Sequence, residues 1–89
     1  MKQLIIFKLR KELFSVLPPE KQIERIEAWI AWVDKYRYLG KCEKAYLVPM
    51  RATGVFIWEL ESFEEADLLS MEAPMYPYME WEIYNLSDW

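Results

Sequence analysis

Carboxylates and tyrosines are the side chains of this sequence best suited to exchange protons with a bound molecule. The chain contains no histidine, so a general base must be a carboxylate, a tyrosine or a lysine. Glu59 shares a strand face with Val55 and Ile57, and we expect burial there to raise the pKa of its carboxyl group. Glu80 shares a face of the last expected strand with Tyr78. Glu59, Tyr78 and Glu80 are therefore the candidate catalytic residues; the alternative is that charges near strand ends lie in water.

A second group of residues could bind a substrate. Tyr46 lies in an expected strand, on the face that also carries Cys42. Trp58 offers a flat apolar surface in the next strand, and Arg51, in the loop between these strands, could hold a carboxylate. Tyr46, Trp58 and Arg51 are the candidate substrate-binding residues. The alternative for Trp58 is that it fills the interior together with Phe56.

Composition excludes several kinds of site. Without histidine, Ser-His-Asp triads, His-ligated haem and His-based zinc sites drop out, and one cysteine, Cys42, excludes a disulfide framework. We expect no metal and no cofactor. The net charge is −4, and the densest basic cluster, residues 8–11, is interpreted as a solvated strand end, so we expect no nucleic-acid partner. No apolar run approaches 18 residues and no signal-peptide pattern is visible, which predicts a cytoplasmic protein without a membrane partner.

The chain carries more apolar material than a small interior can hide. Its 89 residues are 54% hydrophobic and 17% aromatic, and a chain of this length forms one domain, residues 1–89, with a modest core. We expect the excess apolar surface to lie against a partner or around a ligand.

The expected secondary structure alternates strands and helices. The sequence predicts strands at 2–9, 41–48, 55–61 and 78–86, and helices at 18–39 and 63–71. Gly40 is the expected left-handed cap of the first helix. Ser62 and Glu65 form a capping box that begins the second helix, in which Phe63, Ala66 and Leu69 are expected to point inward. The connector 10–17 is expected to fold over the core edge through Leu13, Phe14, Val16 and Leu17, and residues 87–89 form a tail whose Trp89 is a candidate to dock on a neighbour.

The first helix carries two apolar groups. Aliphatic residues recur at three- and four-residue spacing and predict its buried face: Ile23, Ile26, Ile30 and Val33. Aromatic residues form a shoulder beside them: Trp29, Trp32 and Tyr36. These rings either cover the sheet edge or line a subunit contact, and the sequence favours neither.

The strands are apolar on both faces. In the third strand Phe56 and Trp58 point one way while Val55 and Ile57 point the other, and the first strand shows the same pattern. A sheet with one face in water normally alternates apolar and polar residues. The order β-α-β-β-α-β predicts an α+β, ferredoxin-like fold: an antiparallel four-stranded sheet with two helices on one face. A second copy on the open face would make a dimeric α/β barrel, so we expect a homodimer or a higher even oligomer.

The segment from Ser62 to Leu86 resembles the C-terminal part of the muconolactone isomerase family. The resemblance rests on Ser62 at the helix start, on the string Pro74-Met75-Tyr76-Pro77-Tyr78-Met79-Glu80, and on the strand Trp81-Glu82-Ile83 that leads to Leu86. It implies a ferredoxin-like subunit that pairs into a dimeric α/β barrel. The string also has a structural interpretation, since Pro74 and Pro77 fix a helix-to-strand turn.

The resemblance also implies a chemistry. The enzyme that gives the family its name moves a double bond in a small lactone acid without a metal or cofactor. The leading hypothesis is thus a small-molecule-binding protein, acting as a cofactor-free isomerase on a small organic acid or lactone. One alternative is a non-enzymatic oligomerisation or ligand-sensing module, favoured by the lack of a paired acid–base group. A further alternative, by analogy of fold, is a cofactor-independent monooxygenase.

Overall fold

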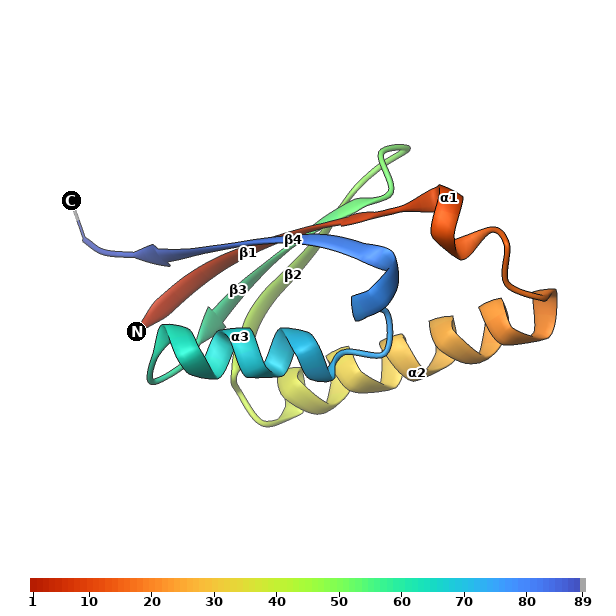
Figure 1. Cartoon of the computed structure of the whole chain (residues 1–89). Helices are drawn as coiled ribbons and strands as arrows, with labels where there is room; N and C mark the ends of the chain where they lie inside the picture. Colours follow the sequence, from red (N-terminus) through yellow and green to blue (C-terminus); the bar gives the residue numbers. More distant parts are fainter. Residues whose placement is uncertain (89) are drawn as a thin grey trace.

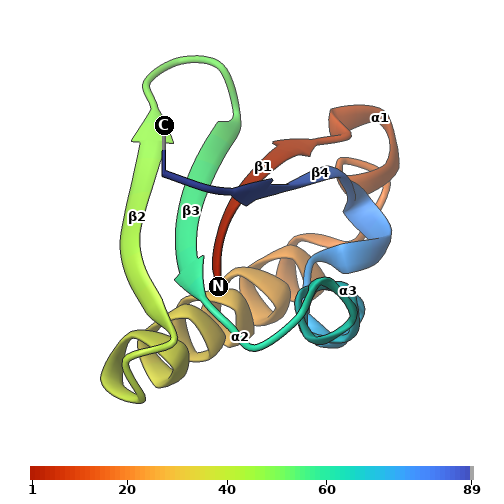
Figure 2. The same cartoon turned by 90° about the vertical axis from the view of Figure 1, so that its left-hand side faces the viewer.

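Four antiparallel strands form one sheet, and two long helices cover one of its faces (Figures 1 and 2). The computed structural model describes residues 1–88. The strands are β1 (Lys2–Leu9), β2 (Cys42–Val48), β3 (Thr53–Glu59) and β4 (Met79–Leu86), in the order β2-β3-β1-β4. The helices are α1 (Lys11–Phe14), α2 (Pro19–Tyr38) and α3 (Phe63–Glu72), with a short 3-10 turn, η1 (Tyr76–Tyr78), before β4. The predicted ferredoxin-like fold is confirmed.

Two details of the element boundaries differ from the sequence prediction. The connector after β1 contains the short helix α1, which buries Phe14 against the ring of Tyr78 but leaves Leu13 and Val16 exposed. Strand β3 begins and ends two residues earlier than predicted, although Leu60 beyond its end is still buried. The terminal Trp89 lies outside the described residues.

The ends of α2 and α3 follow local sequence signals. Gly40 has φ +78°, and the amide of Lys41 donates to the carbonyl of Tyr36 at 3.0 Å, which is the hydrogen bond of a Schellman cap. At the start of α3, the Ser62 hydroxyl accepts from the amide of Glu65 at 3.2 Å. The Glu65 carboxylate accepts a hydrogen bond from the amide of Glu61 at 3.0 Å rather than from that of Ser62. The capping box is confirmed, with its return bond displaced by one residue.

A β-bulge in β2 corrects the predicted position of Tyr46. The register shifts between Cys42 and Lys44, so two residues of β2 occupy the space of one. Cys42 pairs with Trp58 on the helix side of the sheet and is buried, whereas Tyr46 pairs with Val55 and lies on the open side. Tyr46 and Cys42 therefore lie on opposite faces, because the bulge reverses the alternation between them.

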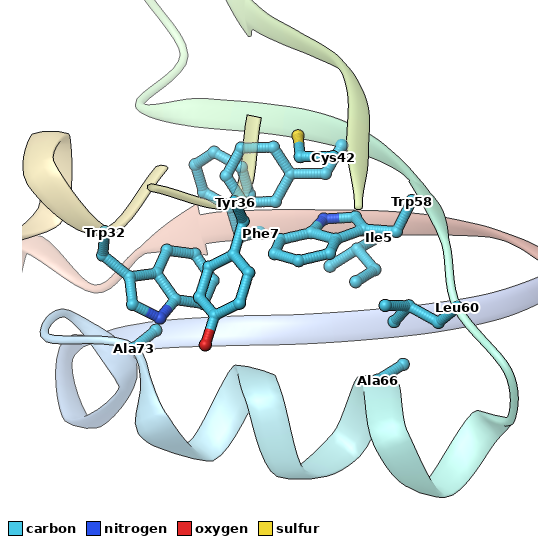
Figure 3. Packing of buried hydrophobic residues seen from close by; sticks show 10 residues of the cluster. Ile5, Phe7, Trp32, Tyr36, Cys42, Trp58, Leu60, Ala66 and Ala73 are labelled. Carbon is cyan, nitrogen blue, oxygen red and sulfur yellow. The ribbon is translucent and has the colours of Figure 1, made fainter. Parts of the chain in front are cut away.

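Aromatic rings fill the space between the sheet and the helices (Figure 3). Phe7 packs against Phe56 at 4.7 Å between ring centroids, and Trp32 packs against Trp58 at 5.5 Å. Trp58 is only 1% exposed. Gly54 makes this packing possible, because the Phe7 ring occupies the position that a Cβ atom at residue 54 would need.

The buried face of α2 is mainly aromatic, and of the four aliphatic residues predicted to be buried, Val33 packs against the core. Trp32 and Tyr36 are buried and Trp29 is half-buried against the core. Ile23, Ile26 and Ile30 are exposed. Because the aromatic side of the helix faces the sheet, the three isoleucines point toward solvent. Of the two alternatives for the aromatic group, contact with the sheet is correct.

On α3 the small residues face the core. Ala66 and Ser70 are buried, whereas Phe63, expected to point inward, is exposed. Ala66 at this contact lets the helix approach the sheet closely.

The face of the sheet opposite the helices is apolar at its centre. Half-buried aliphatic residues from β1 and β3 form that centre: Leu4, Ile6, Val55 and Ile57. Tyr84 and Leu86 of β4 flank it and are exposed. None of the helices within residues 1–88 has the length and hydropathy needed to cross a membrane.

Candidate functional site

A cleft of about 430 Å³ opens between α3 and the edge strand β4. It combines charged, polar and aromatic side chains from α3, the η1 turn, β4 and the residue after β1. The lining residues that could do chemistry are Arg10, Asp67, Ser70, Tyr76, Glu80 and Trp81. Its volume falls within the range of about 300–1,000 Å³ that is usual for small-molecule sites.

Arg10 and Glu80 form the charged rim of this cleft. The Nε atom of Arg10 lies 3.5 Å from Oε1 of Glu80, and both side chains are exposed. The amide of Arg10 donates to the carbonyl of Tyr78 at 2.7 Å, which ties the end of β1 to the η1 turn. The turn itself is set by Pro77, which suits the first positions of a short helix. Backbone contacts therefore place residues 10 and 80 at one end of the cleft. The Glu80 side chain forms its outer rim, because strand alternation puts it on the open side of the sheet beside Lys8.

Aromatic side chains supply the apolar surface of the cleft. Tyr76 and Trp81 lie with ring centroids 6.3 Å apart, and Trp81 also contacts Phe7 of the core at 5.8 Å. The indole N–H of Trp81 is buried and has no hydrogen-bond partner among residues 1–88. The indole N–H groups of Trp32 and Trp58 in the core are unpaired in the same way. A flat ligand in the cleft would thus meet a tryptophan anchored to the core.

The helix wall of the cleft comes from α3. Asp67 is exposed and places a second carboxylate in the cleft. Ser70 is buried and its hydroxyl already donates to the carbonyl of Ala66 at 2.9 Å, so its role is to shape the wall. The cleft therefore contains one cation, two carboxylates and a phenol within one small volume.

The structure does not bring the predicted catalytic residues together. Glu80 lies in the cleft, and Tyr78 lies beside it in the η1 turn with its ring against Phe14. Glu59 lies on the open face of the sheet, where its carboxylate is exposed and accepts from the N-terminal ammonium at 2.9 Å. The predicted burial of Glu59 is wrong for the chain by itself, because no element among residues 1–88 covers the open face.

The predicted substrate-binding residues are also dispersed. Tyr46 is exposed at the β2 edge, Arg51 is exposed at the tip of the β2–β3 hairpin, and Trp58 lies deep in the core. Their assignment to one site is not supported by their positions, and their functional roles stay predictions. The space between the sheet and the helices is occupied by rings such as those of Trp32 and Trp58 (Figure 3).

Contacts elsewhere in the chain shift the pKa values of four ionisable side chains: Lys41, Glu65, Tyr84 and Cys42. A hydrogen bond of 2.6 Å from the Lys41 ammonium lowers the pKa of the Glu65 carboxyl and raises the pKa of Lys41 itself. The nearby Glu82 carboxylate raises the pKa of the Tyr84 hydroxyl, and burial raises the pKa of the Cys42 thiol. Within residues 1–88, no group of three or more possible ligands is placed to hold a metal ion.

Sequence reasoning missed several residues of the cleft. Arg10 was interpreted as part of a solvated strand end, yet it lies beside Glu80 because β1 and β4 are antiparallel neighbours, with Lys8 opposite Glu80. Tyr76 and Trp81 were noted only within the family-like string. Asp67 carried no signal, since an acidic residue on a short helix usually lies in water.

Comparison with solved structures identifies the fold. The crystal structure of muconolactone isomerase matches with a TM-score of 0.81 and 18% identity, over 99% of this chain and 90% of that chain. A second structure is 5-chloro-2-hydroxyhydroquinone dehydrochlorinase from Burkholderia phenoliruptrix AC1100, solved in complex with 2,5-dihydroxybenzoquinone. It matches with a TM-score of 0.72 and 16% identity, over 98% of this chain and 94% of that chain. No protein-family model and no curated protein sequence matches significantly.

These matches confirm a muconolactone isomerase-like fold across nearly the whole chain. The resemblance predicted from the string at Pro74–Glu80 is therefore correct at the level of fold. At identities below one fifth the comparison carries the fold alone, and the chemistry must be argued from this chain's own residues.

Proposed function

We propose that this protein binds a small ring-shaped organic acid in the cleft between α3 and β4 and moves a proton within it without a cofactor. The observation that supports the proposal is that Arg10, Asp67 and the aromatic surface of Tyr76 and Trp81 line one cleft, with Glu80 on its rim. A planar ring would stack on the indole while its carboxylate or enolate oxygen pairs with the guanidinium. The two similar structures, muconolactone isomerase and the dehydrochlorinase in complex with 2,5-dihydroxybenzoquinone, concern ligands of the same size.

The proposed chemistry is a shift of a carbon–carbon double bond. The Glu80 carboxylate takes a proton from a carbon next to a carbonyl group, and the electron pair of that C–H bond forms an enolate. The Arg10 guanidinium stabilises the negative oxygen. The protonated Glu80 then returns this proton to the far carbon of the conjugated system, so that atoms and charge balance.

The experiment has a binding arm and a chemical arm. Binding of benzoate and of 2,5-dihydroxybenzoquinone is measured by isothermal titration calorimetry for the wild type and for R10Q and E80Q. Matched controls are R51Q and E59Q, which change the same charges at the hairpin tip and on the open face. Proton transfer is followed as deuterium incorporation into muconolactone in D₂O by proton NMR.

We expect R10Q to weaken binding at least tenfold, and E80Q to keep binding but to abolish exchange, while both controls behave as the wild type. The reverse pattern, with losses in R51Q and E59Q, would place the site where the sequence candidates lie. Absence of binding and exchange in the wild type would overturn the proposal.

We also propose that a second copy of the chain covers the open face of the sheet. The half-buried aliphatic residues Leu4, Ile6 and Ile57 support this, because an apolar sheet face is rarely left in water. If no ligand binds, the same face together with the filled interior favours the second candidate function, an oligomerisation module. A solution mass of two chains for the wild type and of one chain for I57K would support the pairing, and a wild-type monomer would contradict it.

A further inference from the structure

Helix α2 carries an apolar face that the fold does not use. Ile23, Ile26 and Ile30 are 57%, 44% and 54% exposed. They follow one another at three- and four-residue spacing, which is the spacing of the contact positions of a coiled coil. We call these residues the isoleucine seam. Isoleucine forms helices less readily than leucine or alanine, so an exposed seam of this type indicates packing against another element.

The seam leads into a groove between α2 and the edge strand β2. The groove has a volume of about 160 Å³ and is mostly apolar. One wall is formed by Ile30 and Val33, and the other by Tyr46 and Leu47, with Trp29 and two core phenylalanines among its remaining lining residues. A groove of this size suits a single large apolar side chain, which could anchor a partner lying along the seam.

A row of carboxylates borders the seam on its solvent side. Glu20, Glu27 and Asp34 recur every seven residues on α2 and therefore lie on one line beside the isoleucines. All three are exposed, and the ion pairs formed among residues 1–88 involve other groups. An apolar seam with an acidic border is complementary to an apolar helix with a basic border.

The charge row also indicates that the occupant is not a second α2. In an antiparallel pair of identical helices the same flanking positions meet, so Glu20, Glu27 and Asp34 would face their own copies. Like charges at these positions destabilise a helix pair. In a parallel pair, residues on one side of the seam would face the residues that flank the other side of the partner's seam. On that other side lie Trp29 and Tyr36, which are packed against the core and are not free to make this contact.

We propose that the isoleucine seam and the adjoining groove dock an amphipathic helix of another protein that carries lysine or arginine beside its apolar stripe. Its apolar side chains pack on Ile23, Ile26 and Ile30, and one of them enters the groove. Its basic side chains pair with Glu20, Glu27 and Asp34. The surface lies on the outer side of α2, apart from the cleft at β4, so the proposal does not depend on the function proposed for that cleft.

The test uses two synthetic helical peptides of equal length with leucine at the same positions. One carries lysine at every polar position and the other carries glutamate. Binding of each fluorescein-labelled peptide is measured by fluorescence anisotropy with the full chain. We expect the leucine–lysine peptide to bind and the leucine–glutamate peptide to bind at least tenfold more weakly.

Two variants and two matched controls locate the contact. I26Q/I30Q and E20Q/E27Q/D34N are each expected to weaken binding of the leucine–lysine peptide at least tenfold. V16Q/L68Q changes exposed apolar residues elsewhere, and E12Q/E61Q/E64Q removes the same charge from other exposed carboxylates; both are expected to bind as the wild type. Circular dichroism confirms that each variant is folded, as expected for exposed positions.

Three results would overturn the proposal. One is binding of neither peptide, or of both equally. Another is an equal loss of peptide binding in E12Q/E61Q/E64Q, which would show that the lysine peptide is attracted by the overall negative charge of the protein. The third is a wild-type dimer that I26Q/I30Q converts to a monomer, which would make a second copy the occupant.

Discussion

Substitution of Gly54 tests how completely the interior is filled. A Cβ atom at this position would lie 2.6 and 2.7 Å from two atoms of the Phe7 ring, and nearer still to the ring tip. The ring cannot retreat, because Phe56 packs against it at 4.7 Å and Trp29 at 5.2 Å between centroids. Forcing a methyl group into such a contact typically costs about 1–3 kcal/mol. G54A should therefore lose that much free energy of unfolding.

The assay is urea unfolding followed by tryptophan fluorescence, with G54A measured alone and in an F7L background. Leucine lacks the distal ring atoms that the new methyl group would meet, so the double variant should recover stability, with a coupling energy of about 0.5–3 kcal/mol. G40A is the control. Gly40 has φ +78° and open space around its Cβ position, so its cost of about 1–2 kcal/mol comes from the backbone alone and should not change with F7L.

Equal stability of G54A and wild type would refute the close packing of the Phe7 ring against residue 54. So would a G54A cost that F7L leaves unchanged. Either result would mean that the interior has free volume, and a ligand site there would again compete with the cleft at β4.

Three further predictions concern single side chains. S62A removes the acceptor for the Glu65 amide and should cost about 1 kcal/mol of stability, read from urea unfolding. The pKa of Glu65 is lowered in the folded state, so its stabilising effect is present above the pKa of an unfolded glutamate and is lost as pH falls through the folded value. The stability difference between wild type and E65Q should accordingly be larger at pH 7 than at pH 3; an equal difference would show that the contact with Lys41 is not maintained. Cys42 is buried with a raised thiol pKa, so Ellman's reagent should react slowly with native protein and rapidly in urea; fast native reaction would contradict its burial.

The sequence was sufficient for the fold because its signals are local and mutually consistent. Gly40, Ser62 and the prolines at residues 74 and 77 mark where elements begin and end. The order of elements then leaves the ferredoxin-like arrangement as the simplest topology. The family-like string pointed to the same fold, which the structural comparison confirms.

The sequence predictions that proved wrong are those in which side-chain packing outweighs the periodicity of apolar residues. Periodicity alone favoured Ile23, Ile26 and Ile30 as the buried face of α2, but the larger rings of Trp32 and Tyr36 bury more area and take that position. The bulge after Cys42 reversed the sheet faces on which later β2 side chains lie, and no residue type at that position predicts a bulge.

The candidate site was only partly predictable, since it is assembled from distant segments. Glu80 and Tyr78 lie in the string that the sequence singled out. Arg10 and Asp67 join them only through the pairing of β1 with β4 and the packing of α3 on β4. A residue that gains its role from neighbours across the sheet gives no signal along the chain.

The measurement that tests the central claim most directly is an NMR titration of the ¹⁵N-labelled protein with benzoate and with 2,5-dihydroxybenzoquinone. The cleft between α3 and β4 predicts saturable shifts of the Trp81 indole N–H and of the amides of Asp67, Tyr76 and Glu80, with the amides of Tyr46 and Glu59 unmoved. Shifts confined to Tyr46, Glu59 or the core indoles, or no shift at millimolar ligand, would contradict a binding site in this cleft.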